Sequence, residues 1–426
     1  MQLKRKYFSI VLLLLFGRSF AQEESGFVYS NYAGVNSLFI NPSFGVDSKI
    51  FIDVHLAGAN IFFHNNIAYL PKGELSYQPG KAINTMINEK NVKKKAFAKI
   101  ELTGPSAAVS WKEHSFGIFT RFRTYLDAGV SGNLAYLAIK NFDYAPYIGK
   151  QFKEKAYINT LTWFETGLSY GRMFIVGNYQ TLNVGANIKR LKGVNATSLT
   201  VKDFDYTVLG SKNLFIDHVE GGYRFIEPAW GIGKGWALDA GVNYQYKVRD
   251  VNGYTPNTKK NGCKSIEYKY RAGVSLMDLG AIKIKANAIV QDFEYNYQQF
   301  DFDSIPIKSV SDADDAMQNN LVNNSITQTR GTKFTSMLPL ALAGQFDYNF
   351  ENGLYINTSM VTSIKFNNQT KRTGLLSFTP RYERKLFEIA MPISFVGYTY
   401  PQLGLCLRLG NWIIVGSDRL DSFRGK

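Results

Sequence analysis

The stretch that decides the fold is Trp236-Ala-Leu-Asp-Ala-Gly-Val-Asn-Tyr-Gln-Tyr-Lys-Val248. Every second residue of it, from Trp236 to Val248, is apolar or aromatic. The residues between them are small or polar, and they include the charged Asp239 and Lys247. Because side chains alternate between the two sides of a β-strand, this period of two predicts a strand with one apolar face and one polar face.

The same alternation returns at residues 282–291, with Ile289 as the exception, and at residues 354–366. Each stretch is about ten residues or longer, which is the length that a tilted strand needs to cross a bilayer. Many such strands, with the charged side turned inward, are typical of a transmembrane β-barrel. We therefore predict an all-β fold: an antiparallel up-and-down transmembrane β-barrel of about 14 strands, preceded by a short plug segment.

The first 21 residues have the pattern of a secretory signal peptide. Three bases at residues 4–6 precede an apolar core at residues 7–16, and small residues at Ser19 and Ala21 favour cleavage before Gln22. A membrane anchor is the alternative, but a spanning helix needs about 20 apolar residues. The expected location of the mature chain is the cell outer membrane.

Composition agrees with a barrel and narrows the partners. Aromatic residues make up 15% of the chain, the net charge is +15 and the mean hydropathy is −0.17. Barrels carry aromatic girdles, and the lumen-facing half of their residues keeps the mean hydropathy low. For an exported barrel we expect the basic charge to meet outer-membrane lipid or lipopolysaccharide rather than nucleic acid. The lysines of residues 90–95 form either such a lipid contact or a solvated loop.

The predicted connections alternate between short and long. Tight turns are expected at residues 111–114, 177–178, 278–280, 349–353, 382–385 and 409–411, and longer segments at 64–97, 131–157, 251–263 and 295–332. Short turns at one rim and long loops at the other are characteristic of outer-membrane barrels. Predicted strand cores are 50–63, 98–110, 115–130, 158–175, 179–192, 196–209, 213–226, 236–250, 264–277, 281–294, 333–348, 354–366, 372–381 and 386–397, with a final hairpin at 402–409 and 411–418. The pair 196–209 and 213–226 has one long hairpin as its alternative.

Residues 22–48 lack the period of two and form the predicted plug, between the signal peptide (1–21) and the barrel (49–426). Apolar residues between Ala33 and Phe39 fit a short amphipathic helix. Asn41-Pro42 ends that helix, because a residue before proline avoids the α region. Asn36, Asn41 and Pro42 are the plug residues that we single out. A mobile periplasmic tail is the alternative.

Residues 33–43 and 401–418 resemble the segments that open and close an uncharacterised outer-membrane barrel family of Bacteroidetes. A looser similarity extends to the FadL-type fatty-acid transporters and to PorV, a barrel of the type 9 secretion system. The resemblance implies a FadL-like barrel of fourteen strands with an N-terminal plug, and no assigned activity. The charged inward faces depart from the greasy lumens of FadL-type barrels. The end of the chain, residues 422–426, lacks the usual terminal aromatic, so either 411–418 is the closing strand or a further strand follows.

Strand parity assigns a set of charged residues to the lumen. These residues could bind an anion or set ion selectivity, or they could form a salt-bridged network that holds the plug, and we favour the network. The candidate ligand-binding lumen residues are Arg121, Arg123, Asp127, Asp239, Lys247, Lys283 and Lys285.

Catalysis is not expected, because none of the four histidines lies near a serine in a nucleophile motif. The two cysteines have no metal-ligand spacing with histidine, so no cofactor or metal is expected. The leading expectation is a plugged transporter or channel for a small ligand. The alternative is a non-transporting barrel that serves as a scaffold or partner for secretion machinery or surface proteins, as in PorV, and an outer-membrane lipid hydrolase comes third.

Overall fold

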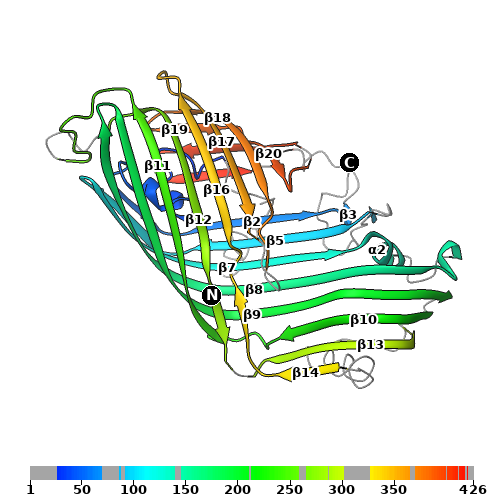
Figure 1. Ribbon diagram of the computed structural model, residues 1–426. Helices are drawn as coiled ribbons and strands as arrows, with labels where there is room; N and C mark the ends of the chain where they lie inside the picture. The colour runs from blue at the N-terminus through cyan, green and yellow to red at the C-terminus, as the bar shows by residue number, and fades with distance from the viewer. Residues whose placement is uncertain are drawn as a thin grey trace, which may run out of the picture.

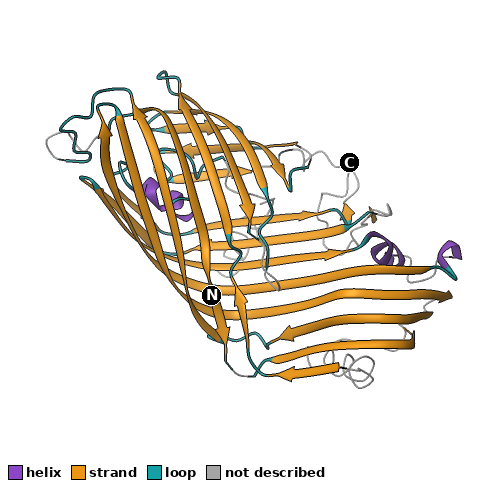
Figure 2. Cartoon of the chain, viewed as in Figure 1, coloured by secondary structure: helices purple, strands orange, loops and turns teal. Residues whose placement is uncertain are grey.

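The computed structural model describes residues 26–69, 86–87, 92–139, 145–210, 213–258, 265–285, 287–301, 327–364, 370–399, 401–410, 412–417 and 420. The predicted signal peptide, Lys90 and Cys263 lie outside these residues, as does most of the predicted loop 295–332. Within them the chain is all-β apart from short helices, as predicted (Figures 1 and 2).

One antiparallel sheet holds twenty-one strands, which join end to end into longer rows wherever a bulge or bend interrupts a strand. The first rows are β1 (Ile52–His55) with β2 (Gly58–Asn65), β5 (Lys94–Thr103) with β6 (Ser106–Trp111), β7 (His114–Val130), β8 (Gln151–Gly177) and β9 (Gln180–Gly210). Next come β10 (Asn213–Phe225) with β11 (Gly233–Lys247), β12 (Tyr268–Ile284) with β13 (Ile289–Asp301), and β14 (Thr327–Gly331) with β15 (Phe334–Met337) and β16 (Ala341–Asn349). The last are β17 (Leu354–Ser363), β18 (Leu375–Glu383), β19 (Phe387–Ala390) with β20 (Ile393–Val396), β21 (Pro401–Leu403) with β22 (Leu405–Leu409), and β23 (Ile413–Ser417).

Each row pairs with the next along the chain, which is the predicted up-and-down order. Among the described residues, however, the sheet is not closed. The row of β1 and β2 pairs on one side only, with β6 and β5, and β23 pairs on one side only, with β22. The two edges run in the same direction, because twelve antiparallel steps separate them.

The polar face of the sheet is buried and the apolar face is exposed, which is the reverse of the usual arrangement in a water-soluble protein. On β11 the apolar Trp236 and Leu238 are 57% and 42% exposed, whereas Asp239 is 2% exposed. The same inversion holds on β17, where Ile356 is exposed and Asn357 is buried. The predicted alternation is therefore confirmed, and its polar face is the one that the curved sheet encloses.

The longest strands depart from the predicted boundaries. β9 runs unbroken through residues 193–195, so the predicted strands 179–192 and 196–209 are one strand. A bulge opposite Thr162 and Trp163 absorbs the interruption without ending the pairing. The hairpin of β9 and β10 is thus the long-hairpin alternative, and Figure 1 shows it extending beside β8 and β13.

The predicted tight turn at 278–280 is wrong, because β12 continues through it. Asp278 has a positive φ of 64° and sits in a bulge opposite Leu238 and Ala240. A bulge adds one residue to a strand and reverses the sides of those that follow. Ile282 and Ile284 are consequently buried, while Lys283 and Lys285 are exposed. Their predicted lumen position is wrong for this reason.

The other predicted tight turns are confirmed: β6–β7, β8–β9, β16–β17, β18–β19 and β22–β23 join at one rim through short links. The exception at this rim is the β11–β12 connection, residues 248–267. The opposite rim carries α2 (Gly132–Ile139), the 3-10 helix η3 (Ala145–Tyr147) and a small separate sheet of β3 (Ala68–Tyr69) with β4 (Met86–Ile87). None of the described helices is both long and apolar enough to cross a membrane.

Candidate functional site: the plug and the interior charges

The N-terminal segment lies inside the curve of the sheet (Figure 2). It forms two 3-10 turns, η1 (Gly34–Phe39) and η2 (Pro42–Gly45), rather than one amphipathic helix. As predicted, the first helical segment ends before Asn41-Pro42, at Phe39. Asn41 caps η2 by accepting a hydrogen bond from the Ser43 amide at 3.0 Å, and Pro42 begins η2. Val35, Asn41 and Ser43 are each fully buried. Hereafter "plug" means residues 26–49.

The wall is shaped to receive the plug by a row of small residues. Gly171, Gly185 and Gly241 pair with one another across β8, β9 and β11. A Cβ atom on Gly185 would lie 2.5 Å from the carbonyl carbon of Pro42, and one on Gly241 would lie 2.1 Å from Oδ1 of Asn41. Any larger side chain in this row would occupy the volume that η2 fills.

Wall side chains bind the backbone carbonyls that the short plug helices leave unpaired. The Asn187 amide donates to the Leu38 carbonyl at 2.8 Å, and the Ser275 hydroxyl donates to the Ile40 carbonyl at 2.5 Å. In the reverse direction the Asp53 carboxylate accepts from the Val35 amide at 2.7 Å. The plug is therefore held by specific polar contacts from several strands.

A buried charge cluster, the central cluster, lies beside η1. Lys189 contacts Asp239 and Asp278, each at 2.6 Å, and Arg123 contacts Asp278 at 2.8 Å. Asp278 can reach both cations because its bulge turns it inward. The cluster meets the plug where Arg121 stacks 4.0 Å from the Phe39 ring. Its cations are Lys99, Arg121, Arg123 and Lys189, and its carboxylates are Glu101, Glu165, Asp239 and Asp278.

A second cluster, the rim cluster, holds both ends of the plug near the short-turn rim. Lys49 pairs with Glu383 at 3.0 Å and with Glu267 at 2.9 Å. The Asn31 amide also donates to Glu383, at 3.0 Å. The Ser30 hydroxyl donates to Glu388 at 2.6 Å. Neighbouring members of the rim cluster are Arg271, Asp347, Arg381 and Arg408.

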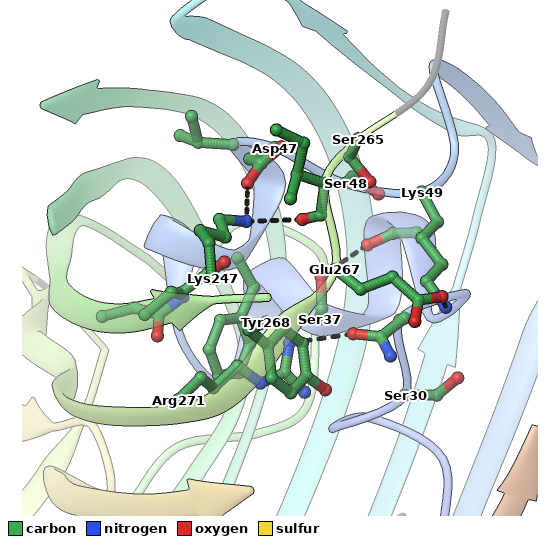
Figure 3. Close-up of a pocket in the computed structure, with 17 residues that line it drawn as sticks. Ser30, Ser37, Asp47, Ser48, Lys49, Lys247, Ser265, Glu267, Tyr268 and Arg271 are labelled. Atoms are coloured by element: carbon green, nitrogen blue, oxygen red, sulfur yellow. Dashed lines mark hydrogen bonds and ion pairs between the residues drawn. The ribbon is translucent and has the colours of Figure 1, made fainter. Parts of the chain in front are cut away.

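Between the plug and the wall lies a polar cavity of about 30 Å³ (Figure 3). Lys247 forms an ion pair with Asp47 there, and the Tyr254 hydroxyl donates to the same carboxylate at 2.7 Å. Burial and then Asp47 raise the pKa of Tyr254. Burial disfavours the charge on Lys49, but Glu383, followed by Tyr355 and Glu267, outweighs it and raises the pKa of Lys49. A cavity of this volume holds about one water molecule.

The predicted site residues thus divide into three groups. Arg121, Arg123 and Asp239 meet in the central cluster, and Lys247 meets the plug. Asp127 is buried apart from them, where the Tyr157 hydroxyl donates to it at 3.4 Å, and Asn36 is half-buried on η1. Lys283 and Lys285 lie on the outer face. In the predicted lysine group of residues 90–95, Lys94 is buried rather than available to lipid.

Sequence reasoning found three of the eight residues of the central cluster and missed the other five. Four of those five lie on the inward parity of their strands, so extending the alternation to β5, β8 and β9 would have found Lys99, Glu101, Glu165 and Lys189. Asp278 carried no such signal, because its orientation depends on the bulge. His114 and His218 hydrogen-bond to Tyr170 and Asn296 rather than to a serine. No group of three metal-ligating side chains occurs among the described residues.

The sheet, the charged residues of the two clusters and the second half of the plug lie within one family match. A model described as "Family of unknown function (DUF5723)" matches residues 42–418. The chain belongs to this family. The match spans η2, the glycine row and every charged residue of the two clusters, whereas η1 lies before it. Among curated proteins no sequence matches the chain.

Proposed function

We propose that this DUF5723 protein crosses the outer membrane as a β-barrel and that its plug closes a conduit for a small polar ligand. The exposed apolar face of the sheet supports the membrane location, because an aqueous protein rarely exposes so large an apolar surface. The resemblance of residues 33–43 to barrels of Bacteroidetes agrees with it.

Two aromatic belts mark the proposed limits of the bilayer. At the short-turn rim Tyr246 stacks on Tyr179 at 5.8 Å and on Tyr270 at 5.3 Å, and Tyr270 stacks on Phe346. Ten residues along β11, which is about 33 Å of strand, Trp236 marks the other limit. Because barrel strands are tilted by about 40°, this length spans about 25 Å along the bilayer normal, which is the height of the apolar band that aromatic side chains flank in outer-membrane barrels.

A membrane-spanning sheet must close, because unpaired backbone groups are costly in lipid. We propose that the row of β1 and β2 meets β23 as a parallel seam. Cysteines introduced at Val54 and Val415, in a background without Cys263 and Cys406, are expected to form a disulfide in the membrane-inserted protein. Absence of any disulfide between β23 and positions 52–55 would contradict the seam.

The observation that carries the transport proposal is the polar plug–wall interface. Asn187, Ser275 and Lys247 bind the plug through hydrogen bonds and an ion pair that water or a polar ligand can replace. The strands of the wall hydrogen-bond directly to one another, so their pairing does not run through the plug. Displacement of the plug would therefore open a charged interior suited to a polar or ionic ligand rather than a fatty acid. No catalytic step is proposed.

The second candidate is a non-transporting scaffold for secretion machinery or surface proteins. The small plug–wall cavity favours it, since about 30 Å³ leaves no room for a ligand beside the plug. In that case the two charge clusters fill the interior permanently and keep the wall rigid. The surface that binds partners then lies on the outside of the protein.

Single-channel conductance in planar bilayers separates the two candidates. The refolded mature chain is compared with a chain that starts at Ile50, and both are checked for the heat-modifiable gel mobility of folded barrels. A silent mature chain and a conducting truncated chain are expected for a plugged conduit. Two silent, folded proteins would overturn the transport proposal and favour the scaffold.

A further inference from the structure

Three lysines form a row on the outer face of the sheet. Lys234 on β11 pairs directly with Lys192 on β9 and with Lys283 on β12. All three side chains are exposed. These strands are neighbours in the sheet (Figure 1), so the three lysines form one row of direct cross-strand partners. Hereafter "lysine row" means Lys192, Lys234 and Lys283.

The row is unfavourable by itself. Like charges directly opposite one another on neighbouring strands are destabilising, because their Cβ atoms lie only about 5 Å apart. Within the described part of the chain, none of the ion pairs involves these three lysines. Lys192 instead lies 5.8 Å from the ring of Trp230, a cation–π contact that leaves its charge uncompensated. An anion seated across the row would remove the repulsion.

The surroundings of the row show where that anion comes from. The Arg190 guanidinium stacks 4.8 Å from the ring of Trp236. These two residues are cross-strand partners, and each lies two residues from the lysine row along its own strand. Beyond this pair the outward side chains become apolar, with Ile188 and Leu238 51% and 42% exposed. The order along the strands is therefore apolar, tryptophan with arginine, and then lysine. This is the order of a bilayer from its hydrocarbon to its phosphate layer.

We propose that the lysine row binds the phosphate of a phosphorylated outer-membrane lipid whose acyl chains lie against the apolar stripe. This inference rests on the proposed membrane location and assigns the lipid contact to a specific site. Three ammonium groups across about 10 Å of sheet can bind one or two phosphates as point charges. The bulge at Asp278 creates the site, because without it Lys283 would point inward.

The test is lipid retention in detergent, read by native mass spectrometry of the full mature chain with diphosphorylated lipid A. The row variant carries Lys192→Gln, Lys234→Gln and Lys283→Gln. The control variant carries Lys150→Gln, Lys155→Gln and Lys385→Gln, which removes the same charge from exposed lysines outside the row and outside residues 90–95. We expect the row variant to bind lipid A roughly tenfold or more weakly, and the control to match the unmodified chain.

Two further arms identify the ligand. Dephosphorylated lipid A should not be retained by the unmodified chain, and millimolar inorganic phosphate should not displace lipid A. Equal retention by the row variant, equal loss in the control, or full displacement by free phosphate would each overturn the proposal. Insertion of all three proteins into bilayers is measured separately, so a failed membrane location is distinguishable from a failed lysine row.

Thermal stability gives a readout that does not depend on lipid binding. In neutral detergent Lys234→Gln should raise or preserve the unfolding midpoint, because it relieves the repulsion in the row. With lipid A present the same variant should unfold at a lower temperature than the unmodified chain. A Lys234→Gln variant that is destabilised in both conditions would contradict the proposal.

Discussion

Gly185 lies so close to Pro42 that a Cβ atom on it would sit 2.5 Å from the Pro42 carbonyl carbon. The contact is with backbone, which cannot move aside as a flexible side chain can. Gly185→Ala is therefore expected to push η2 away from β9 and to produce conductance in a protein that is otherwise silent. The matched control is Gly344→Ala in β16, where a Cβ atom would meet nothing within 4 Å. A Gly185→Ala protein as silent as its control would mean that the plug does not seal the interior.

The ion pair between Asp47 and Lys247 should hold the second half of the plug. Lys247→Gln leaves the buried Asp47 carboxylate with Tyr254 but without its cation, which costs about 3–5 kcal/mol. We expect increased tryptic cleavage after Lys49 in the folded protein. Adding Asp47→Asn should recover part of the loss, because the unpaired charge disappears. Equal cleavage of the single and double variants would show that the pair does not hold the plug.

Asp278 is expected to be the residue on which the central cluster depends. Asp278→Ala leaves Arg123 and Lys189 with fewer buried carboxylates and should destabilise the protein by about 3–5 kcal/mol. Asp292→Ala removes the partner of Arg224 at an exposed pair and should cost about 1 kcal/mol or less. Urea unfolding followed by heat-modifiable mobility measures both. Similar losses in the two variants would contradict the assigned role of the cluster.

Plug closure should be insensitive to pH between about pH 6 and pH 10 and weaken above that range. The raised pKa of Lys49 means that its stabilising contribution is present below the unfolded pKa and is lost as pH rises through the folded pKa. Tyr254 acts in the same direction, because its raised pKa keeps it neutral when the unfolded phenol would ionise. Conductance titrated from neutral to alkaline pH checks this, and Lys49→Gln with Tyr254→Phe should flatten the response. Opening between about pH 6 and pH 9 instead would contradict it.

The sequence predicts those features of the fold that depend on the alternation of side chains along a strand. The alternation in residues 236–248 placed Asp239 and Lys247 inward and Trp236 outward without any tertiary information, because a strand has only two sides. The plug was also predictable, since residues 33–43 break the period of two and are largely apolar. The pattern predicted a closed barrel, whereas the described part of the sheet is open between the row of β1 and β2 and β23. Pairing of these two edges depends on no local sequence signal.

The wrong turn at 278–280 and the wrong positions of Lys283 and Lys285 arise from one residue. Asp278 was predicted to lie in a turn, because Asp-Leu-Gly is a common turn sequence. In the structure it forms a bulge, and the strand continues with its sides reversed. Lys283 and Lys285 consequently lie on the outer face rather than in the predicted lumen, and Lys283 belongs to the lysine row. A bulge changes which side of the sheet the later residues face without changing the residues themselves, so the composition of the strand does not reveal it.

In the proposed arrangement the apolar face of this sheet contacts lipid and its polar face encloses the plug. Spin labels placed singly at Leu238, Val242 and Asn243, in a background without Cys263 and Cys406, test it in reconstituted bilayers. Leu238 and Val242 should be accessible to oxygen and shielded from a water-soluble nickel chelate, with Val242 deeper than Leu238. Asn243 should be shielded from both, because η2 and the wall bury it. If the nickel chelate reached Leu238 and Val242 as readily as it reaches a loop in water, the apolar face would not contact lipid and the proposed membrane location would be wrong.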